Sequence, residues 1–231
     1  MTQVMAHRGA SKVETENTRV AFERALEMGA DAVELDVRRC GSGELVVHHD
    51  AKLSDGRAII KVDKSDLPSY IPTLAEALDA CGSMWVNVEI KNEAKEPDFD
   101  PTEQITRDVV ELLRQRNTPD KWLISSFRRE TVDAVRQLMP DFKTAWLVVT
   151  LDNAELESVA VKMAAQGHFA LHPWVKQLSK QVVEVFHRYG LQVNTWTCDD
   201  PARMKELIEW QVDGICTNVP DIALQVLRTP R

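Results

Sequence analysis

Eight short apolar runs alternate with amphipathic helical patterns along the 231 residues of the chain. The apolar runs, interpreted as buried strands, are Gln3–Ala6, Ala32–Val37, Trp85–Ile90, Trp122–Ser125, Thr144–Val148, Phe169–His172, Gln192–Thr195 and Gly214–Cys216. The helical patterns between them are roughly Thr18–Met28, Thr73–Cys81, Thr102–Arg116, Glu130–Leu138, Asn153–Met163, Lys180–Tyr189, Pro201–Glu209 and Asp221–Leu227. A strand followed by a helix, repeated in this way, predicts an α/β fold whose parallel strands close into a (β/α)8 TIM barrel of about 200–250 residues.

A doubly wound open sheet is the main competing architecture. No Gly-x-Gly-x-x-Gly pattern follows an early strand, as the dinucleotide-binding sheets of that type require. A ninth extended run, Val46–His49, follows the turn Gly41-Ser42-Gly43 and is expected to extend the loop after strand two without joining the barrel. The aperiodic segment Ala51–Pro72 is expected to pass over the barrel mouth, and residues 1–231 are expected to form one domain.

The charge balance limits the partners that the chain can bind. There are 36 Asp and Glu residues against 28 Lys and Arg residues, which gives a formal net charge of −8. Nucleic acids and anionic membrane surfaces repel an acidic protein, so neither is an expected partner. A small phosphate ligand is compatible with this balance, because a local cluster of cations and a metal ion can hold it. Oligomeric state is not predicted.

The cysteines and the N-terminus indicate the compartment. Cys40, Cys81, Cys198 and Cys216 show no Cys-x-x-Cys spacing, so free thiols are expected and a zinc site is not. Reduced thiols are typical of the cytoplasm. The residues that precede His7 are too few for a signal peptide, and no apolar stretch approaches the ~18 residues of a membrane-spanning helix. The expected location is therefore cytoplasmic.

Three carboxylates fall where the second and third expected strands end. Glu34 and Asp36 are two residues apart, which places both side chains on one face of a strand, and Glu89 ends the next strand. In a closed barrel the carboxyl ends of the strands meet at one face, where active sites assemble. Clustered carboxylates that are buried repel one another, and a hard divalent cation such as Mg²⁺ or Ca²⁺ relieves that repulsion.

Basic side chains accompany these carboxylates. His7 and Arg8 end strand one, and Lys91 follows Glu89 with the same spacing of two. Each residue taken alone has an ordinary structural interpretation: a hydrogen-bonded histidine, a surface cation, or an ion pair across a strand. Their occurrence together at successive strand ends, all before residue 92, favours a single site.

The motifs that contain these residues resemble the glycerophosphodiester phosphodiesterase family. The matching segments are Ala6-His7-Arg8-Gly9-Ala10, Glu16-Asn17-Thr18, Glu34-Leu35-Asp36-Val37, Val46-Val47-His48-His49-Asp50, Ile71-Pro72-Thr73-Leu74, Val88-Glu89-Ile90-Lys91, Ser125-Ser126-Phe127, Thr195-Trp196-Thr197 and Asp213-Gly214-Ile215-x-Thr217-Asn218-x-Pro220. They cover nearly the whole chain, and the first 50 residues carry the most specific of them.

The resemblance implies a role for each residue of the site. Glu34, Asp36 and Glu89 would hold one divalent metal ion. His7 and His49 would be the general acid and base, in an order that the sequence leaves open. Arg8 and Lys91 would neutralise the phosphodiester, and Trp196 would line the pocket. Asn17 or Thr18 is expected to cap the first helix, as these residue types prefer.

The implied reaction is metal-dependent hydrolysis of a small-molecule glycerophosphodiester to glycerol 3-phosphate and an alcohol, with glycerophosphocholine and glycerophosphoethanolamine as expected substrates. Attack by water and attack by the glycerol 2-hydroxyl are both compatible with the motifs. Two alternatives are a related barrel phosphodiesterase acting on lysophospholipids and a catalytically silent module that binds a phosphate ligand. No amphipathic or basic segment suited to an acyl chain is evident, and both histidines and all three carboxylates are present.

Overall fold

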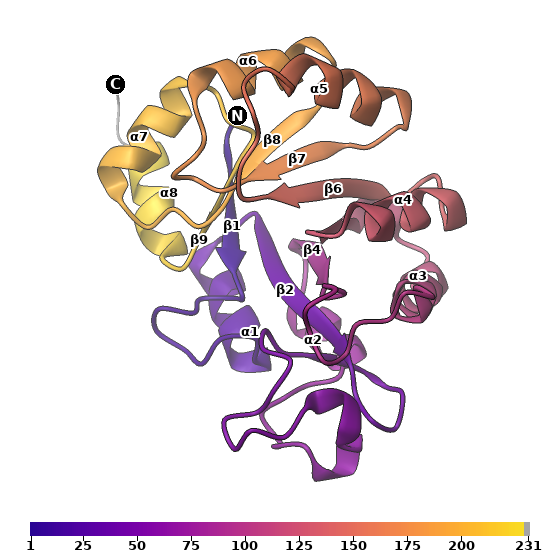
Figure 1. Ribbon diagram of the computed structural model, residues 1–231. Helices are drawn as coiled ribbons and strands as arrows, with labels where there is room; N and C mark the ends of the chain where they lie inside the picture. Colours follow the sequence, from indigo (N-terminus) through magenta and orange to yellow (C-terminus); the bar gives the residue numbers. More distant parts are fainter. Residues whose placement is uncertain (229–231) are drawn as a thin grey trace.

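The computed structural model describes residues 1–228, and its centre is a closed barrel of eight parallel strands (Figure 1). The strands are β1 (Gln3–His7), β2 (Ala32–Arg39), β4 (Trp85–Ile90), β5 (Trp122–Ser126), β6 (Lys143–Val148), β7 (Ala170–Pro173), β8 (Gln192–Thr195) and β9 (Gly214–Thr217). Each pairs with its neighbour around the ring, and pairing of β1 with both β9 and β2 closes the barrel. The predicted (β/α)8 architecture is therefore confirmed.

A helix follows each of these strands and packs on the outside of the barrel (Figure 1). The helices are α1 (Arg19–Met28), α2 (Leu74–Ala80), α3 (Gln104–Gln115), α4 (Arg129–Leu138), α5 (Leu156–Ala165), α6 (Lys180–Arg188), α7 (Pro201–Glu209) and α8 (Pro220–Arg228). Within residues 1–228, none of the helices has the length and apolar character needed to cross a membrane. All four cysteines are buried and free, as expected.

Local hydrogen bonds explain where these helices begin. Thr73 caps α2 through a capping box, in which its hydroxyl accepts from the Glu76 amide and the Glu76 carboxylate accepts from the Thr73 amide. The start predicted for α5, Asn153, is three residues early. The carboxylate of Asp152 accepts from the amide of Ala154, and this turn delays the helix to Leu156.

Alternation along the strands separates core residues from site residues. In β4, Val86, Val88 and Ile90 belong to the apolar cluster that lies between the barrel and helices α1–α3. Asn87 and Glu89 consequently point into the barrel, because successive side chains of a strand face opposite sides. The same alternation in β2 turns Glu34 and Asp36 inward. The fold thus collects its buried carboxylates in the barrel interior.

The extended run after β2 forms β3 (Leu45–Val47), an antiparallel partner of β2 outside the barrel. Its position outside the barrel agrees with the prediction, but the predicted extent to His49 is wrong. Regular pairing stops at Val47, and His48 and His49 lie in the bend that follows. Strand alternation therefore does not determine which of the two histidines faces the site.

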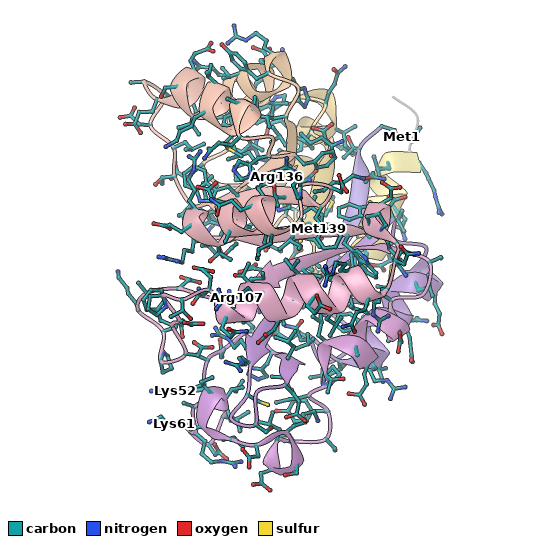
Figure 2. The ribbon with its side chains drawn as sticks, turned by 90° about the vertical axis from the view of Figure 1, so that its right-hand side faces the viewer. Met1, Lys52, Lys61, Arg107, Arg136 and Met139 are labelled. Carbon is teal, nitrogen blue, oxygen red and sulfur yellow. The ribbon has the colours of Figure 1, made fainter. Side chains whose placement is uncertain are left out.

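The insertion, residues 51–72, packs beside the barrel. It contains two short 3-10 helices, η1 (Ile59–Lys61) and η2 (Lys64–Asp66). The insertion and the end of β2–β3 share a small core of their own, made of Cys40, Val46, Leu53, Ile59, Val62, Leu67 and Ile71. The insertion lies at the bottom of Figure 1, and its Lys52 and Lys61 side chains extend outward in Figure 2. No side chain of the insertion is among those that line the cavity at the carboxylates. The expectation that this segment passes over the barrel mouth stays a prediction.

Gly9→Ala should destabilise the protein more than Gly29→Ala. Both glycines are left-handed, with φ of 84° and 85°, so alanine costs about 1 kcal/mol at each position. A Cβ at Gly29 meets nothing within 4 Å, whereas one at Gly9 would lie 2.6 Å from the backbone of Ala21 in α1. This clash should add about 1–3 kcal/mol at Gly9 alone. Urea denaturation followed by circular dichroism measures both losses, and equal losses would contradict the argument.

Candidate active site

Three carboxylates form a buried cluster at the carboxyl ends of β2 and β4. Glu34, Asp36 and Glu89 each offer an oxygen, and these oxygens lie within 4.8 Å of one another. Parallel pairing sets Asp36 opposite Glu89, so that the two side chains project at one level. The residues are 3%, 1% and 7% exposed. The predicted set of metal ligands is therefore together in space and almost completely removed from solvent.

Burial and mutual repulsion separate the pKa values of the three groups. Burial, reinforced by the nearby Asp36 and Glu89, raises the pKa of Glu34 well above its ordinary value. Burial also raises the pKa of Glu89. Asp36 behaves oppositely: although burial opposes its ionisation, Lys91, Arg8 and His49 lower its pKa to about 2.

Lys91 is a buried cation within the carboxylate cluster. Its Nζ lies 2.8 Å from Glu89 Oε1 and 3.6 Å from Asp36 Oδ1. Burial disfavours the charged ammonium, but these two carboxylates outweigh burial and raise the pKa of Lys91. The same Nζ lies 5.7 Å above the ring of Phe127. Lys91 therefore stays charged at the wall of the site.

Arg8 approaches the cluster from the end of β1. Its backbone amide donates to Glu34 Oε2 at 3.0 Å, and its Nε lies 3.2 Å from Asp36 Oδ2. Its Nη1 reaches Glu16 at 2.9 Å. The backbone φ of Arg8 is 56°, a left-handed conformation that is uncommon for a residue with a side chain. The turn after β1 thus directs both the amide and the guanidinium at the carboxylates.

Asn17 orients Asp36 from the loop before α1. Its Nδ2 donates to Asp36 Oδ2 at 2.8 Å, and its Oδ1 accepts from the Asp36 amide at 3.3 Å. Asn17 is also left-handed, with φ of 57°. The cap of α1 is Thr18, whose hydroxyl accepts from the amide of Ala21 at 3.3 Å. Of the two caps that the sequence allowed, Thr18 is thus the helix cap and Asn17 belongs to the site.

His7 is oriented by a chain of hydrogen bonds that ends at Asp199. Asn218 Nδ2 donates to the Asp199 carboxylate at 2.7 Å, so its Oδ1 must face the other way. That oxygen is 2.7 Å from His7 Nδ1 and accepts a hydrogen bond from it. Nδ1 therefore carries the hydrogen of the neutral ring, and Nε2, which lies 4.0 Å from Glu34 Oε2, has a free lone pair. Burial, together with Arg8, lowers the pKa of His7.

Nδ1 of His49 is hydrogen-bonded in a similar way. It lies 2.7 Å from the carboxylate of Asp50, which accepts a hydrogen bond from Nδ1–H and leaves Nε2 free. The charge of His49 is close enough to help lower the pKa of Asp36. His48 Nδ1 is occupied differently, by the backbone carbonyl of Asp50 at 2.8 Å. His49 is thus close enough to the carboxylates to influence them electrostatically.

An aromatic wall stands beside the carboxylates. Trp196 lines a cavity of about 20 Å³ together with His7, Glu34 and Glu89. Its Nε1 donates to the carbonyl of His172 at 2.7 Å, and its ring meets Phe127 edge to face at 5.2 Å. These contacts hold the indole in one orientation at the site. Burial lowers the pKa of His172 to about 3, so the cavity wall has a neutral imidazole.

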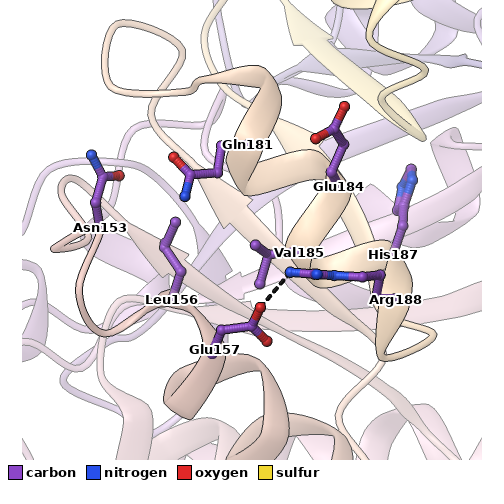
Figure 3. A pocket seen from close by; sticks show the side chains of 8 residues that line it. All are labelled: Asn153, Leu156, Glu157, Gln181, Glu184, Val185, His187 and Arg188. Carbon is purple, nitrogen blue, oxygen red and sulfur yellow. Dashed lines mark hydrogen bonds and ion pairs between the residues drawn. The ribbon is translucent and has the colours of Figure 1, made fainter.

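A second hollow lies on the outer layer, between α5 and α6 (Figure 3). Its walls include Leu156, Gln181 and Val185, and Glu157 and Arg188 form an ion pair across it. None of its lining residues belongs to a barrel strand or to the carboxylate cluster. The groove is therefore separate from the candidate site.

The sequence motifs contained the supporting residues without revealing what they support. Asn17 and Asn218 occur in matched segments, but only the tertiary contacts show that they orient Asp36 and His7. Asp199 carried no sequence signal beyond its place three residues after Trp196. Polar residues just beyond a strand that carries a site residue would have been the clue to look for.

The chemistry of the carboxylate cluster fits a divalent cation. Glu34 Oε1 is buried and has no hydrogen-bond partner among the described residues. An unpartnered buried carboxylate oxygen is costly, and here two further carboxylates surround it. All the potential ligand atoms are carboxylate oxygens, which hard cations such as Mg²⁺ and Ca²⁺ prefer. The cluster could therefore hold such an ion.

Comparison with known proteins identifies the family. Residues 7–222 match the model of the glycerophosphoryl diester phosphodiesterase family. The chain belongs to this family. A glycerophosphodiester phosphodiesterase of Caldanaerobacter subterraneus subsp. tengcongensis is 31% identical over 98% of both chains. One of Bacillus subtilis is 30% identical over 94% of this chain and 84% of its own. Membership makes this protein an enzyme of the phosphoric diester hydrolase class.

Solved structures of the family share the fold. A phosphodiesterase of Oleispira antarctica, solved in complex with the product sn-glycerol-3-phosphate, has a TM-score of 0.86 and 25% identity, covering 99% of this chain and 98% of its own. A protein of Silicibacter pomeroyi, described as a glycerophosphoryl diester phosphodiesterase, has a TM-score of 0.88 at 23% identity, covering 98% and 93%. The closed barrel is thus the fold of the family.

Glu34→Gln should flatten the pH dependence of stability of the metal-free protein. Because the folded-state pKa of Glu34 lies above its ordinary value of 4.5, the folded protein binds more protons than the unfolded chain above that pH. The wild-type free energy of unfolding should therefore fall as pH rises through this range, and the variant should lose less. Urea denaturation in EDTA between about pH 5 and about pH 8 measures the slopes.

Glu23→Gln is the matched control for this measurement, because Glu23 is an exposed carboxylate of α1. The free energy of unfolding of this variant should change with pH in the same way as that of the wild type. A Glu34→Gln slope equal to the wild-type slope would show that Glu34 does not carry the unfavourable buried charge.

Proposed function

We propose that this enzyme hydrolyses glycerophosphodiesters to glycerol 3-phosphate and an alcohol, using one divalent metal ion and two histidines. The observation that carries the proposal is the buried carboxylate cluster, with a free Nε2 on His7 and with His49 close enough to help lower the pKa of Asp36. A phosphodiester is anionic and repels nucleophiles, so its hydrolysis needs cations and proton transfer at one place. The carboxylate cluster provides ligands for a cation, and the neighbouring histidines provide groups for proton transfer.

Glu34, Asp36 and Glu89 would hold the ion, Mg²⁺ or Ca²⁺. When bound, the ion would polarise a phosphate oxygen and offset the negative charge that builds on the oxygens around phosphorus. With all three carboxylates ionised, the charges of Arg8 and Lys91 leave the site with a formal charge of −1. A divalent cation changes this to +1, which attracts a phosphodiester monoanion.

Arg8 and Lys91 would contact the phosphate directly. Both are already held at the rim of the cluster by ion pairs to Asp36, so little conformational entropy is lost when substrate binds. Trp196 would lie against the alcohol half of the substrate. Its π-face can hold a quaternary ammonium such as choline, which favours glycerophosphocholine among the expected substrates.

His7 and His49 would carry the protons. One Nε2 takes a proton from the nucleophile, which is water or the glycerol 2-hydroxyl, and the other gives a proton to the leaving alkoxide. Asn218 and Asp50 occupy the two Nδ1 atoms, so in each neutral ring Nε2 is the nitrogen that remains for this work. Burial holds the pKa of His7 below its ordinary value, which favours the neutral form that a base requires.

The proposed metal dependence can be tested directly. EDTA should abolish phosphodiesterase activity, and Mg²⁺ or Ca²⁺ should restore it, because the carboxylates alone repel an anionic substrate. The decisive assay measures turnover of glycerophosphocholine, glycerophosphoethanolamine and lysophospholipids with each ion and with EDTA. Full activity after exhaustive chelation would refute the metal. Turnover of lysophospholipids alone would transfer the assignment to that substrate class, and no turnover at all would indicate a binding module.

His49→Ala should reduce kcat by roughly 10²–10⁴-fold, because it removes a proton-transfer partner. His48→Ala is the matched control, since Nδ1 of its ring is hydrogen-bonded to the backbone carbonyl of Asp50. It should cost much less. Comparison of kcat for the two variants, with folding checked by circular dichroism, decides between them. A near-normal His49→Ala enzyme beside an inactive His48→Ala enzyme would reverse the assignment.

A further inference from the structure

Arg38 is a cation with almost no contact with solvent. It follows Asp36 by two residues on β2, and its side chain is 1% exposed. A guanidinium is costly to bury unless its donors are satisfied and its charge is neutralised. Arg38 has no part in the proposed chemistry, and its burial beside the site therefore needs another explanation.

The partners of Arg38 join two loops of the active-site end. Its Nε and Nη2 both donate to the backbone carbonyl of His49, at 2.9 and 2.6 Å. Its Nη1 donates to Asp98 Oδ2 at 2.7 Å, and the Asp98 side chain is only 3% exposed. Glu96 is a more distant partner at 4.0 Å. The guanidinium thus connects the bend that carries His49 with the loop between β4 and α3.

We propose that Arg38 is a positioning residue for the reaction, which fixes the backbone of His49 so that its imidazole faces the carboxylates. This inference rests on the proposed role of His49. The bend after Val47 lies beyond the last pair of the β2–β3 ladder and is held by individual contacts. One is the His48 amide, which donates to the Asp36 carbonyl at 3.0 Å, and another is the Arg38 guanidinium on the His49 carbonyl. A charge-assisted pair of donors on one carbonyl is a strong and directional contact of this kind.

Asp98 completes the arrangement by neutralising the buried guanidinium. Without it, Arg38 would gain by turning toward water, away from the carbonyl. The fork geometry also matters, because Nε and Nη2 can converge on one carbonyl while Nη1 keeps the carboxylate. Lysine has a single nitrogen on a flexible stem and cannot hold both partners in this geometry. Arg38→Lys therefore separates charge from positioning.

The test is a double-mutant cycle between Arg38→Lys and His49→Ala, assayed with glycerophosphocholine and saturating Mg²⁺. In the wild-type background Arg38→Lys should lower kcat by about ten- to a hundredfold with KM nearly unchanged, as expected for a misplaced catalytic group. In the His49→Ala background it should lower kcat by no more than about twofold, because residues that act through one another are not additive.

Asp98→Asn provides a second cycle that needs no change to Arg38. It should lower kcat by about three- to tenfold in the wild-type background and have almost no effect beside His49→Ala. The matched control is Arg39→Lys on the same strand. Arg39 pairs with Asp108 at 3.3 Å, is much more exposed and does not contact His49, so kcat should be unchanged.

The possible outcomes lead to clear decisions. Equal losses of kcat in both backgrounds, or a wild-type kcat in Arg38→Lys, would overturn the positioning role. If Arg38→Lys does not fold by circular dichroism, the Asp98→Asn cycle decides by the same criteria. A His49→Ala enzyme with normal kcat would instead refute the proposed function of His49, and the single variants distinguish that failure from a failure of Arg38.

Discussion

The repulsion among three buried carboxylates is the interaction on which the rest of the site depends. Oxygen atoms of Glu34, Asp36 and Glu89 are brought within 4.8 Å of one another by strand pairing, in a barrel interior where the three residues are almost completely removed from solvent. This arrangement is unfavourable by itself, as the raised pKa of Glu34 shows. Lys91 and Arg8 offset part of the negative charge, and the part that remains would favour the divalent cation proposed for this site.

The polar residues around the cluster each satisfy a specific donor or acceptor. Asn17 donates a hydrogen bond to Asp36. Asn218 accepts one from Nδ1 of His7, and Asp50 accepts one from Nδ1 of His49. The two histidine contacts leave each Nε2 available for the proposed proton transfers. Two of the backbone positions involved, Arg8 and Asn17, are left-handed, and such strain is commonly found where the surroundings hold a functional geometry.

Sequence reasoning recovered the barrel because alternation of strands and helices is a local property. The eight strands were located to within a few residues, and Glu34, Asp36 and Glu89 were recognised at their ends because strand ends converge in a barrel. One expectation failed for a non-local reason. The strand expected to reach His49 ended at Val47, where its pairing with β2 stops.

The sequence by itself determined the alternation of strands and helices and the chemical types of the site residues, because both depend on the order of side chains along the chain. Only the tertiary structure decided which residues orient them. Arg38 and Asp98 are 60 positions apart and Asn218 is 211 positions from His7, so no local pattern connects these partners. Closure of the barrel brings them together, and burial then makes each hydrogen bond strong enough to select one geometry.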